Sequence, residues 1–383
     1  MTPCLTNTHI HTNYSFSVFE SPAQAVEQAV SENIGILGIN DHYTIAGYDE
    51  FRAACAAHAI CPMFSMEAVA LDVEMQTAGK RVNDPNNPGR CYLTAKSVTR
   101  ALRPGSRGDA VLKRMRAALT KRNEQLVGNL NTHLASVGAP VTLSMKAVEA
   151  LTPAGNTTER HVIQHLAESV LAQGNGEARA LFTQLCGAEP PAMDVAAKLQ
   201  DFLRGKLVKA GCPDYAPEVT EAFESLPDMV ELYLEMGAIP TYPILGNPVT
   251  EAEEDVAAMF KRLEGYKIFA YEVIPNRNTP ERILDIVKTA GEFQVPIFTG
   301  TEHNTKTPGP LVDKYSNEEP FKTAFFNGAL VALGHAAEVK RGNIGYVRPD
   351  GSLRFTNRAQ GLAYFMERGR EVYGRTQPAM ARA

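Results

Sequence analysis

The sequence lacks the features that mark several large classes of protein. None of its 383 residues fall in an unbroken apolar run of the roughly 18 residues that a membrane helix needs, so we expect no membrane partner. The formal net charge of −5 and the pI near 6.0 are not those of a general nucleic-acid binder, which is usually basic. We therefore expect no nucleic acid as a stable partner. The first residues carry no basic segment followed by an apolar core, and no signal peptide is expected.

A cysteine framework is also missing. The six cysteines are scattered and form no CxxC pair, which favours reduced, buried thiols in a cytoplasmic protein over disulfides. With 44% hydrophobic and 21% charged residues, the composition is that of an ordinary folded domain, and disorder is not indicated.

Alternating strands and helices are what the sequence does contain. CLTNTHIHT, IGILGIN and CPMFSMEAVALD have the pattern of strands, and helical segments lie between them, the first with a serine N-cap followed by proline. The alternation returns from about Gly237 with AIPTYPI, KIFAYEVI and VPIFTG. Repeated βα units predict an α/β fold with a parallel sheet or barrel, whose functional site lies at the carboxyl ends of the strands.

The middle of the chain has a different pattern. Apolar residues recur there with a helical period and without convincing strands. We therefore predict three parts: residues 1–99 as the first part of the barrel, 100–236 as an α-helical insertion, and 237–383 as the second part with C-terminal helices. Because the insertion interrupts the βα pattern, its ends should be neighbours at the rim, and we expect it to act as a lid.

Polar side chains follow the predicted strands. His9 and His11 alternate in the first strand, so they project from the same side and can share one metal ion. IGILGIN runs into His42, CPMFSM runs into Glu67, and VPIFTG runs into residues 302–303. Side chains at these positions should meet at one mouth of the barrel. Mixed imidazole and carboxylate ligands suit Zn, Mn or Fe.

These motifs resemble those of the PHP (polymerase and histidinol phosphatase) family of metal-dependent phosphoesterases. HIHTNYS, GINDH, SMEAV and GTEHNT correspond to the family's four strand-end motifs, and TERHVIQHLAESV and VELYLEMGAIPTYPI support the likeness. The similarity runs from Thr8 to about Thr305, and the chain is a divergent member by this criterion. It implies a distorted (β/α)7 TIM-like barrel and hydrolysis of phosphate esters with bound metal ions.

The resemblance also implies a ligand set. Carried over residue by residue, one metal site is retained, whereas Phe16, Tyr242 and Asn304 stand where further metal ligands would be. Phenylalanine cannot ligate, and tyrosine and asparagine are poor substitutes for imidazole. We therefore expect one tightly bound divalent transition-metal ion. Its expected ligands are His9, His11, Glu67 and Glu302.

Roles for other residues follow from the same resemblance. His42 and His303 are the expected acid or base residues, and Arg160 and His161 are expected to contact an anionic substrate. Tyr242 either packs as an aromatic residue or fills the space of the missing histidine and contacts substrate. A basic stretch between residues 80 and 122 is either a solvated face or part of a substrate-binding cap.

Together these features predict a metal-dependent hydrolase. The expected reaction is hydrolysis of a small phosphorylated metabolite or nucleotide by a metal-activated water. Two alternatives stay open at this point: a diverged PHP protein that binds one metal and a small anionic ligand without hydrolysis, and an amidohydrolase-type hydrolase. The sequence specifies neither the leaving group nor the oligomeric state.

Overall fold

The computed structural model describes residues 2–246, 248–313 and 315–376. The last part of the predicted third segment, residues 377–383, lies outside the described residues. Within the described ranges, no helix combines the length and the hydrophobicity that a membrane span requires.

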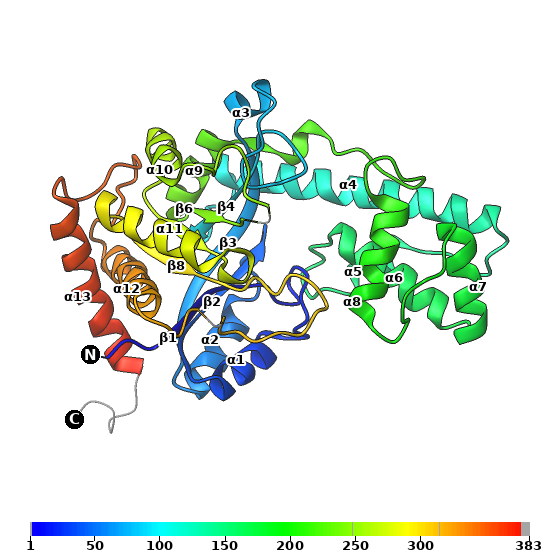
Figure 1. The fold of residues 1–383 in the computed structure, drawn as a ribbon, viewed down its shortest axis with the longest axis horizontal. Coiled ribbons are helices and arrows are strands. Elements are labelled where there is room, and N and C mark those ends of the chain that lie inside the picture. Colours follow the sequence, from blue (N-terminus) through cyan, green and yellow to red (C-terminus); the bar gives the residue numbers. More distant parts are fainter. Residues whose placement is uncertain (1, 247, 314, 377–383) are drawn as a thin grey trace.

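Seven strands form a nearly closed barrel in the order β1-β2-β3-β4-β6-β7-β8 (Figure 1). All neighbours are parallel except β4, which runs antiparallel to β3 and β6. Closure comes from a bridge between Ile10 and Glu302, with the His11 N–H donating to the Glu302 carbonyl at 2.7 Å. The strands are β1 (Leu5–Ile10), β2 (Ile34–His42), β3 (Cys61–Leu71), β4 (Arg90–Lys96), β6 (Ile239–Ile244), β7 (Tyr271–Val273) and β8 (Ile297–Thr299). A two-residue strand, β5 (Glu224–Ser225), pairs with the end of β3.

Helices cover the outside of this barrel. The first begins as its sequence predicts, because the Ser21 hydroxyl caps the helix and Pro22 occupies its first turn. The last two form a layer in which α12, apolar on most sides, is buried between the sheet and α13 (Figure 1). The barrel helices are α1 (Pro22–Ser31), α2 (Tyr48–Ala57), α3 (Val73–Thr77), α9 (Leu226–Glu235), α10 (Val256–Gly265), α11 (Pro280–Phe293), α12 (Phe321–Lys340) and α13 (Arg358–Thr376), with the short 3-10 turn η3 (Pro275–Arg277) after β7.

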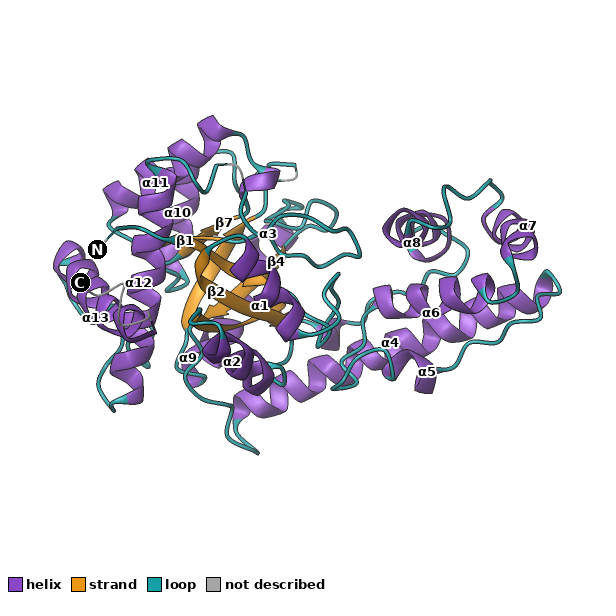
Figure 2. Cartoon of the chain, turned by 90° about the horizontal axis from the view of Figure 1, so that it is seen from below, coloured by secondary structure: helices purple, strands orange, loops and turns teal. Residues whose placement is uncertain are grey.

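The remaining helices form a second body with its own core. It is built on the long helix α4 (Arg107–Ser136), and its buried apolar residues run from Leu126 to Ala216. Figures 1 and 2 show α5 to α8 standing to one side of the barrel rather than across it. Helix α9, by contrast, is part of the barrel core. The other elements of this body are α5 (Met145–Glu149), α6 (Glu159–Leu171), α7 (Asn175–Cys186), α8 (Ala196–Leu203), the π-helical turn η1 (Arg204–Val208) and the 3-10 turn η2 (Thr220–Ala222).

One edge of the helical body reaches the carboxyl ends of β1 and β2. The Asn156 amide, just before α6, donates to the His42 carbonyl at 2.6 Å and to the Tyr14 carbonyl at 3.3 Å. These contacts place the first turn of α6 at the barrel mouth. The bulk of the helical body stands to one side of the barrel in Figure 2, and its action as a lid stays a prediction.

Candidate metal centre

Two imidazoles and a carboxylate converge inside the barrel mouth. The Nε2 atoms of His9 and His11 lie 3.2 Å apart, as expected for alternating residues at the end of one strand. Glu67 faces them from β3, with its Oε1 3.8 Å from His9 Nε2 and its Oε2 3.6 Å from His11 Nε2. One ligand atom from each residue lies within 4.8 Å of the other two. All three side chains are buried.

The orientation of His9 is set by a buried ion pair behind it. Its Nδ1 lies 2.7 Å from Glu272 Oε2, and the other Glu272 oxygen accepts from the Lys96 ammonium and from the Thr8 hydroxyl. Burial alone would raise the pKa of Glu272, but Lys96 and His9 outweigh it and bring the pKa to about 2. An ionised carboxylate can only accept, so His9 carries its proton on Nδ1 and its Nε2 lone pair points to the cluster.

A second chain of hydrogen bonds orients His11. Its Nδ1 lies 3.2 Å from the Ser15 hydroxyl, and Ser15 lies 2.6 Å from Asp41 Oδ1. Asp41 also accepts from the N–H and the hydroxyl of Thr12, both at 2.7 Å. Because Ser15 donates to the carboxylate, it accepts from His11 Nδ1–H. The Nε2 atom of His11 is thus also an unprotonated lone-pair donor.

This arrangement fits a divalent metal ion. Two lone-pair nitrogens lie 3.2 Å apart with no proton between them, and the buried Oε1 atom of Glu67 has no hydrogen-bond partner among the described residues. Two ligands held at about 2.0–2.1 Å by a tetrahedral ion would be separated by roughly 3.3 Å. Burial raises the pKa of Glu67 well above its usual range, and the nearby Glu302 and Glu272 add to this effect. A cation bound at this position would stabilise the ionised Glu67 carboxylate and would be coordinated by all three ligand atoms.

His42 lies at the open side of this cluster, as predicted. It pairs in register with Glu67 across β2 and β3, and its Nδ1 is 3.2 Å from Glu67 Oε2. The ring also lies against His11, with 4.4 Å between centroids. Burial, with His9 and Arg160 nearby, lowers the pKa of His42 to about 3, so the ring is neutral.

Glu302 lies next to the cluster but is engaged elsewhere. Its Oε2 accepts from the Arg277 guanidinium and, at 3.1 Å, from the Asn304 amide. It is not among the three residues at metal-ligand spacing. The turn that carries it is unusual, because Glu302 and His303 have φ values of 63° and 56°, a left-handed conformation often retained at functional sites. A Cβ at Gly300 would lie 2.2 Å from that of His9, so only glycine permits this close approach.

His303 does not have the free ring nitrogen that an acid or base residue requires. Its Nδ1 is 2.8 Å from the Thr301 hydroxyl, and its Nε2 is 3.1 Å from the Gly309 carbonyl. The ring stacks on Phe19. These contacts give His303 a structural place in the loop after β8, which differs from its predicted catalytic role.

Tyr242 is likewise not brought to the site. On β6 it is Thr241 that faces the barrel interior, because Thr241 pairs with Thr94, whose hydroxyl accepts from the Asn40 amide at 3.4 Å. Tyr242 therefore points to the opposite face of the strand. There it is fully buried and donates to Glu253 at 3.2 Å. Of the two roles predicted for Tyr242, the structure shows the aromatic packing residue and not a side chain that faces the site.

The two predicted substrate residues do lie at the mouth, around Phe16. The His161 ring meets Phe16 edge-on with 5.0 Å between centroids, and the Arg160 guanidinium and the Lys306 ammonium lie 5.8 Å and 5.2 Å from the Phe16 centroid. The Thr158 N–H donates to His161 Nδ1 at 3.0 Å, which leaves the ring proton on Nε2. Burial, with Lys306 nearby, lowers the pKa of His161 to about 3. A neutral donor and two cations therefore surround Phe16.

Sequence reasoning missed three charged residues of this site. Lys96 belongs to the basic stretch of the sequence, and Glu272 lies in a strand that is otherwise apolar. Both have fully buried side chains. A charged residue inside an otherwise apolar strand was the available signal. Arg277 lies four residues after the last residue of β7, at the end of η3, so the strand-end rule that identified His42 and Glu67 did not reach it.

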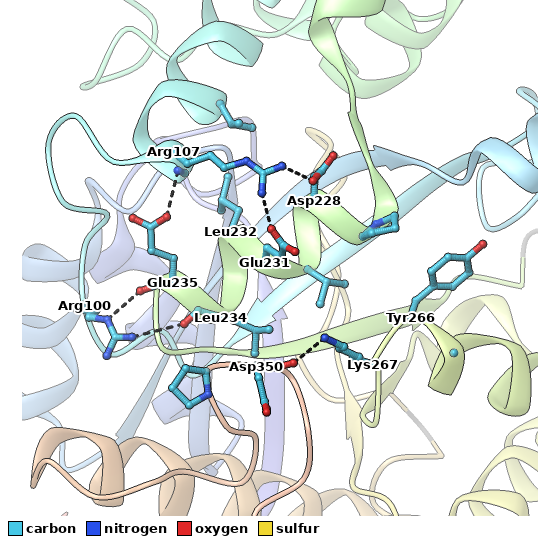
Figure 3. A pocket seen from close by; sticks show the side chains of 16 residues that line it. Arg100, Arg107, Asp228, Glu231, Leu232, Leu234, Glu235, Tyr266, Lys267 and Asp350 are labelled. Carbon is cyan, nitrogen blue, oxygen red and sulfur yellow. Dashed lines mark hydrogen bonds and ion pairs between the residues drawn. The ribbon is translucent and has the colours of Figure 1, made fainter.

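The rest of the basic stretch is mostly a paired surface. Arg81, Arg90, Arg107 and Arg114 each form ion pairs with acidic residues far along the chain. Some of these pairs line a cavity of about 600 Å3 beside α9 (Figure 3). Its residues precede β6 and β7, so it lies at the end of the barrel opposite the metal cluster.

Comparisons with known proteins agree with this architecture. A family model described as PHP domain matches residues 7–187. A candidate metal-dependent phosphoesterase from Bifidobacterium adolescentis has a similar structure, with a TM-score of 0.55 and 19% identity, covering 80% of this chain and 91% of that one. An amidohydrolase from Chromobacterium violaceum, with bound sulfate and no metal, has a TM-score of 0.52 and 15% identity, covering 81% and 94%. No curated protein matches the sequence. The predicted barrel fold is thereby confirmed.

Proposed function

Because a PHP domain model matches residues 7–187, we propose that the chain is a metal-dependent hydrolase that acts on a small phosphate ester. The observation that carries the proposal is the pair of imidazole nitrogens 3.2 Å apart beside a buried carboxylate oxygen without a partner. Groups so arranged repel one another unless a cation lies between them. His9, His11 and Glu67 would hold a divalent ion such as Zn, Mn or Fe.

Three protein ligands leave a coordination position open, which is typical of catalytic rather than structural sites. A bound ion there would polarise a substrate oxygen and lower the pKa of a water molecule toward neutrality. The protein's part is to hold the ligands in their reactive orientation. Glu272 and Ser15 do this for the two imidazoles, since each accepts from an Nδ1–H.

A phosphate ester is favoured by the charges around the mouth. Arg160 of α6, which also pairs with Asp201, and Lys306 of the loop after β8 lie over the Phe16 ring, and Arg277 of η3 is bonded to Glu302. A guanidinium or ammonium group binds phosphate oxygens through charge-assisted hydrogen bonds. His161 adds a neutral Nε2–H donor. An amide substrate would have no need of this positive rim.

His42 is the proposed proton-transfer residue. Its neutral ring lies beside Glu67 at the open side of the cluster, 16% exposed. From there it can hydrogen-bond either a water molecule or the leaving oxygen of the ester. His303 is not included in this role, because both of its ring nitrogens are already bonded.

The test is metal content together with phosphate release. Purified protein dialysed against Mn or Zn should retain metal and release inorganic phosphate from at least one member of a panel of phosphomonoesters. His11→Ala should lose the metal and at least 100-fold of the activity. His165→Ala removes a half-exposed histidine of α6 whose Nδ1 lies 3.4 Å from Ser169, and it should leave both unchanged.

Different failures have different meanings. A protein that binds no metal under these conditions contradicts the proposal at its base. Metal binding with no release from any ester would instead favour the non-hydrolytic alternative, and release of ammonia or an acid from an amide panel would favour an amidohydrolase.

A further inference from the structure

Asn156 joins the helical body to the barrel at the mouth. It lies in the segment before α6, 6% exposed, and its side-chain amide donates to the carbonyls of Tyr14 and His42. Tyr14 follows β1 and His42 ends β2, so one amide bridges two neighbouring strand ends. Both N–H groups of the amide are used in this way. Removing them would take a donor from each of the two carbonyls.

The same segment is fixed to the helical body on its other side. The Asn123 amide of α4 donates to the carbonyl of Thr157 at 3.2 Å and to its hydroxyl at 3.1 Å. Glu159, the first residue of α6, forms ion pairs with three cations of the helical body, which are Arg122, Arg204 and Lys209. Residues 156–159 are therefore part of the helical body, and Asn156 ties them to the barrel.

Helix α4 connects the two bodies away from the mouth. It begins at the opposite end of the barrel, where Arg107 lines the cavity of Figure 3. Val111 and Met115, in its first half, are buried in the barrel core, whereas Leu126 belongs to the core of the helical body. A single helix shared by two cores leaves the angle between them to the remaining contacts, because a long helix can curve. A second attachment, at the mouth, fixes that angle.

The proposed substrate contacts follow directly after this segment. Arg160 and His161 lie in the first turn of α6, against Phe16 of the barrel. Because they belong to the helical body and the metal cluster belongs to the barrel, their distance from the cluster depends on how the two bodies meet. We propose that Asn156 is a positioning residue that fixes this distance. The inference rests on the proposed function, because it presumes that Arg160 and His161 bind the anionic substrate.

The experiment measures binding of inorganic phosphate to the metal-loaded full chain by calorimetry. Asn156→Leu keeps the approximate size of the side chain and removes its donors. The variant should bind the metal ion as the wild-type protein does and bind phosphate about tenfold more weakly, which is the scale of one or two lost hydrogen bonds. Asn156→Gln retains an amide donor on a longer arm, and it should recover most of the affinity.

The matched control is an asparagine that joins two parts of the helical body to each other. The Asn131 side chain of α4 donates to the Leu143 carbonyl and accepts from the Leu143 N–H. Asn131→Leu therefore removes hydrogen bonds of the same kind without touching the barrel. Its phosphate affinity should equal that of the wild-type protein.

A double-mutant cycle separates positioning from a direct contact with phosphate. If Asn156 acts through Arg160, then Asn156→Leu and Arg160→Ala together should weaken phosphate binding by less than the product of the two single effects. Asn156→Ser has a hydroxyl too short to reach both carbonyls, and it tests the same prediction should Asn156→Leu fail to fold.

Three results would overturn the inference alone: wild-type phosphate affinity in a folded Asn156→Leu or Asn156→Ser variant, an equal loss in Asn131→Leu, or single effects that multiply in full with that of Arg160→Ala. A wild-type protein that binds neither the metal ion nor phosphate would instead overturn the proposed function on which the inference rests.

Discussion

The two ends of the barrel differ in how completely their charged groups are paired. At the mouth, charged and polar atoms are buried and incompletely partnered: two imidazole nitrogens face each other, and Glu67 Oε1 has no partner. At the other end, a cavity of about 600 Å3 is lined by groups that satisfy one another, with Arg107 bonded to two carboxylates and Lys267 bonded to the Asp350 carbonyl (Figure 3).

The two ends thus differ in how completely their charged and polar groups are paired. An exposed ion pair contributes little to stability. Because both of its charged groups already have partners, it offers no unpaired group to a ligand. A buried donor or acceptor without a partner is costly, and a protein that retains several of them gains when a ligand binds there. We therefore expect ligands to bind at the mouth.

The largest effect we expect comes from breaking the buried pair behind His9. Lys96→Met would leave Glu272 ionised at zero exposure, and removal of one partner of a buried pair typically costs about 3–5 kcal/mol. The free energy of unfolding from urea denaturation should fall by that amount. Lys113→Met, which removes a 71% exposed partner of Asp109, should change it by less than about 1 kcal/mol. Equal effects from both variants would show that burial does not decide the difference.

A buried acid outside the mouth offers a test of the same idea through pH. Burial raises the pKa of Glu253 to about 7, although Tyr242 donates to it and opposes the shift. The native state thus keeps a proton that the unfolded chain releases above pH about 4.5. Stability that is present at pH 4.5 is lost as the pH rises to about 7, by up to about 3 kcal/mol.

Glu253→Gln should remove this dependence. The variant should match the wild-type protein at pH 5 and exceed its free energy of unfolding at pH 8. Glu254→Gln, on the exposed neighbour, should follow the wild-type curve at both pH values. A Glu253→Gln variant that is less stable than wild type at pH 8 would mean that the carboxylate is ionised and well solvated in the native state.

A smaller effect is expected from the hydrogen bond that orients His11. Ser15→Ala removes the acceptor of His11 Nδ1–H, and loss of such a supporting partner typically lowers metal affinity by about 10–100-fold. Competition with a chelator would measure it. Ser17→Ala removes an equally buried hydroxyl that accepts from the Phe19 N–H in the loop rather than from a ligand histidine, and it should leave affinity unchanged. Similar losses in both variants would indicate loop disruption rather than ligand orientation.

The parts of this molecule that could be predicted from sequence depend on local pattern. The alternation of His9 and His11 within one strand is set by strand geometry alone, and their proximity follows from it. The barrel follows from repeated βα units, and the convergence of His42 and Glu67 follows from parallel strands ending at one mouth. None of these inferences requires the register of distant strands.

What could not be predicted depends on that register. Lys96 and Glu272 are 176 residues apart, and only the order of strands in the sheet brings them behind His9. Tyr242 shows the same limit in reverse. A shift of one residue exchanges the two faces of a strand, so the sequence could not decide whether Thr241 or Tyr242 faces the interior. The pairing of Glu302 with Arg277 is also an encounter between loops of neighbouring strands.

The smallest effect we expect is at the opposite end, and it is the strictest test of the comparison. Arg107→Met deletes two ion pairs that line the cavity of Figure 3. Because the Arg107 side chain is 63% exposed, its pairs are screened by water, and the free energy of unfolding should change by about 0–1 kcal/mol. Metal affinity and phosphate release should equal those of the wild-type protein, because the cavity lies beyond the strands from the cluster. A loss of phosphate release in a folded, metal-loaded Arg107→Met variant would mean that this cavity binds a ligand that the reaction needs, and that paired charges at this end do not mark it as inert.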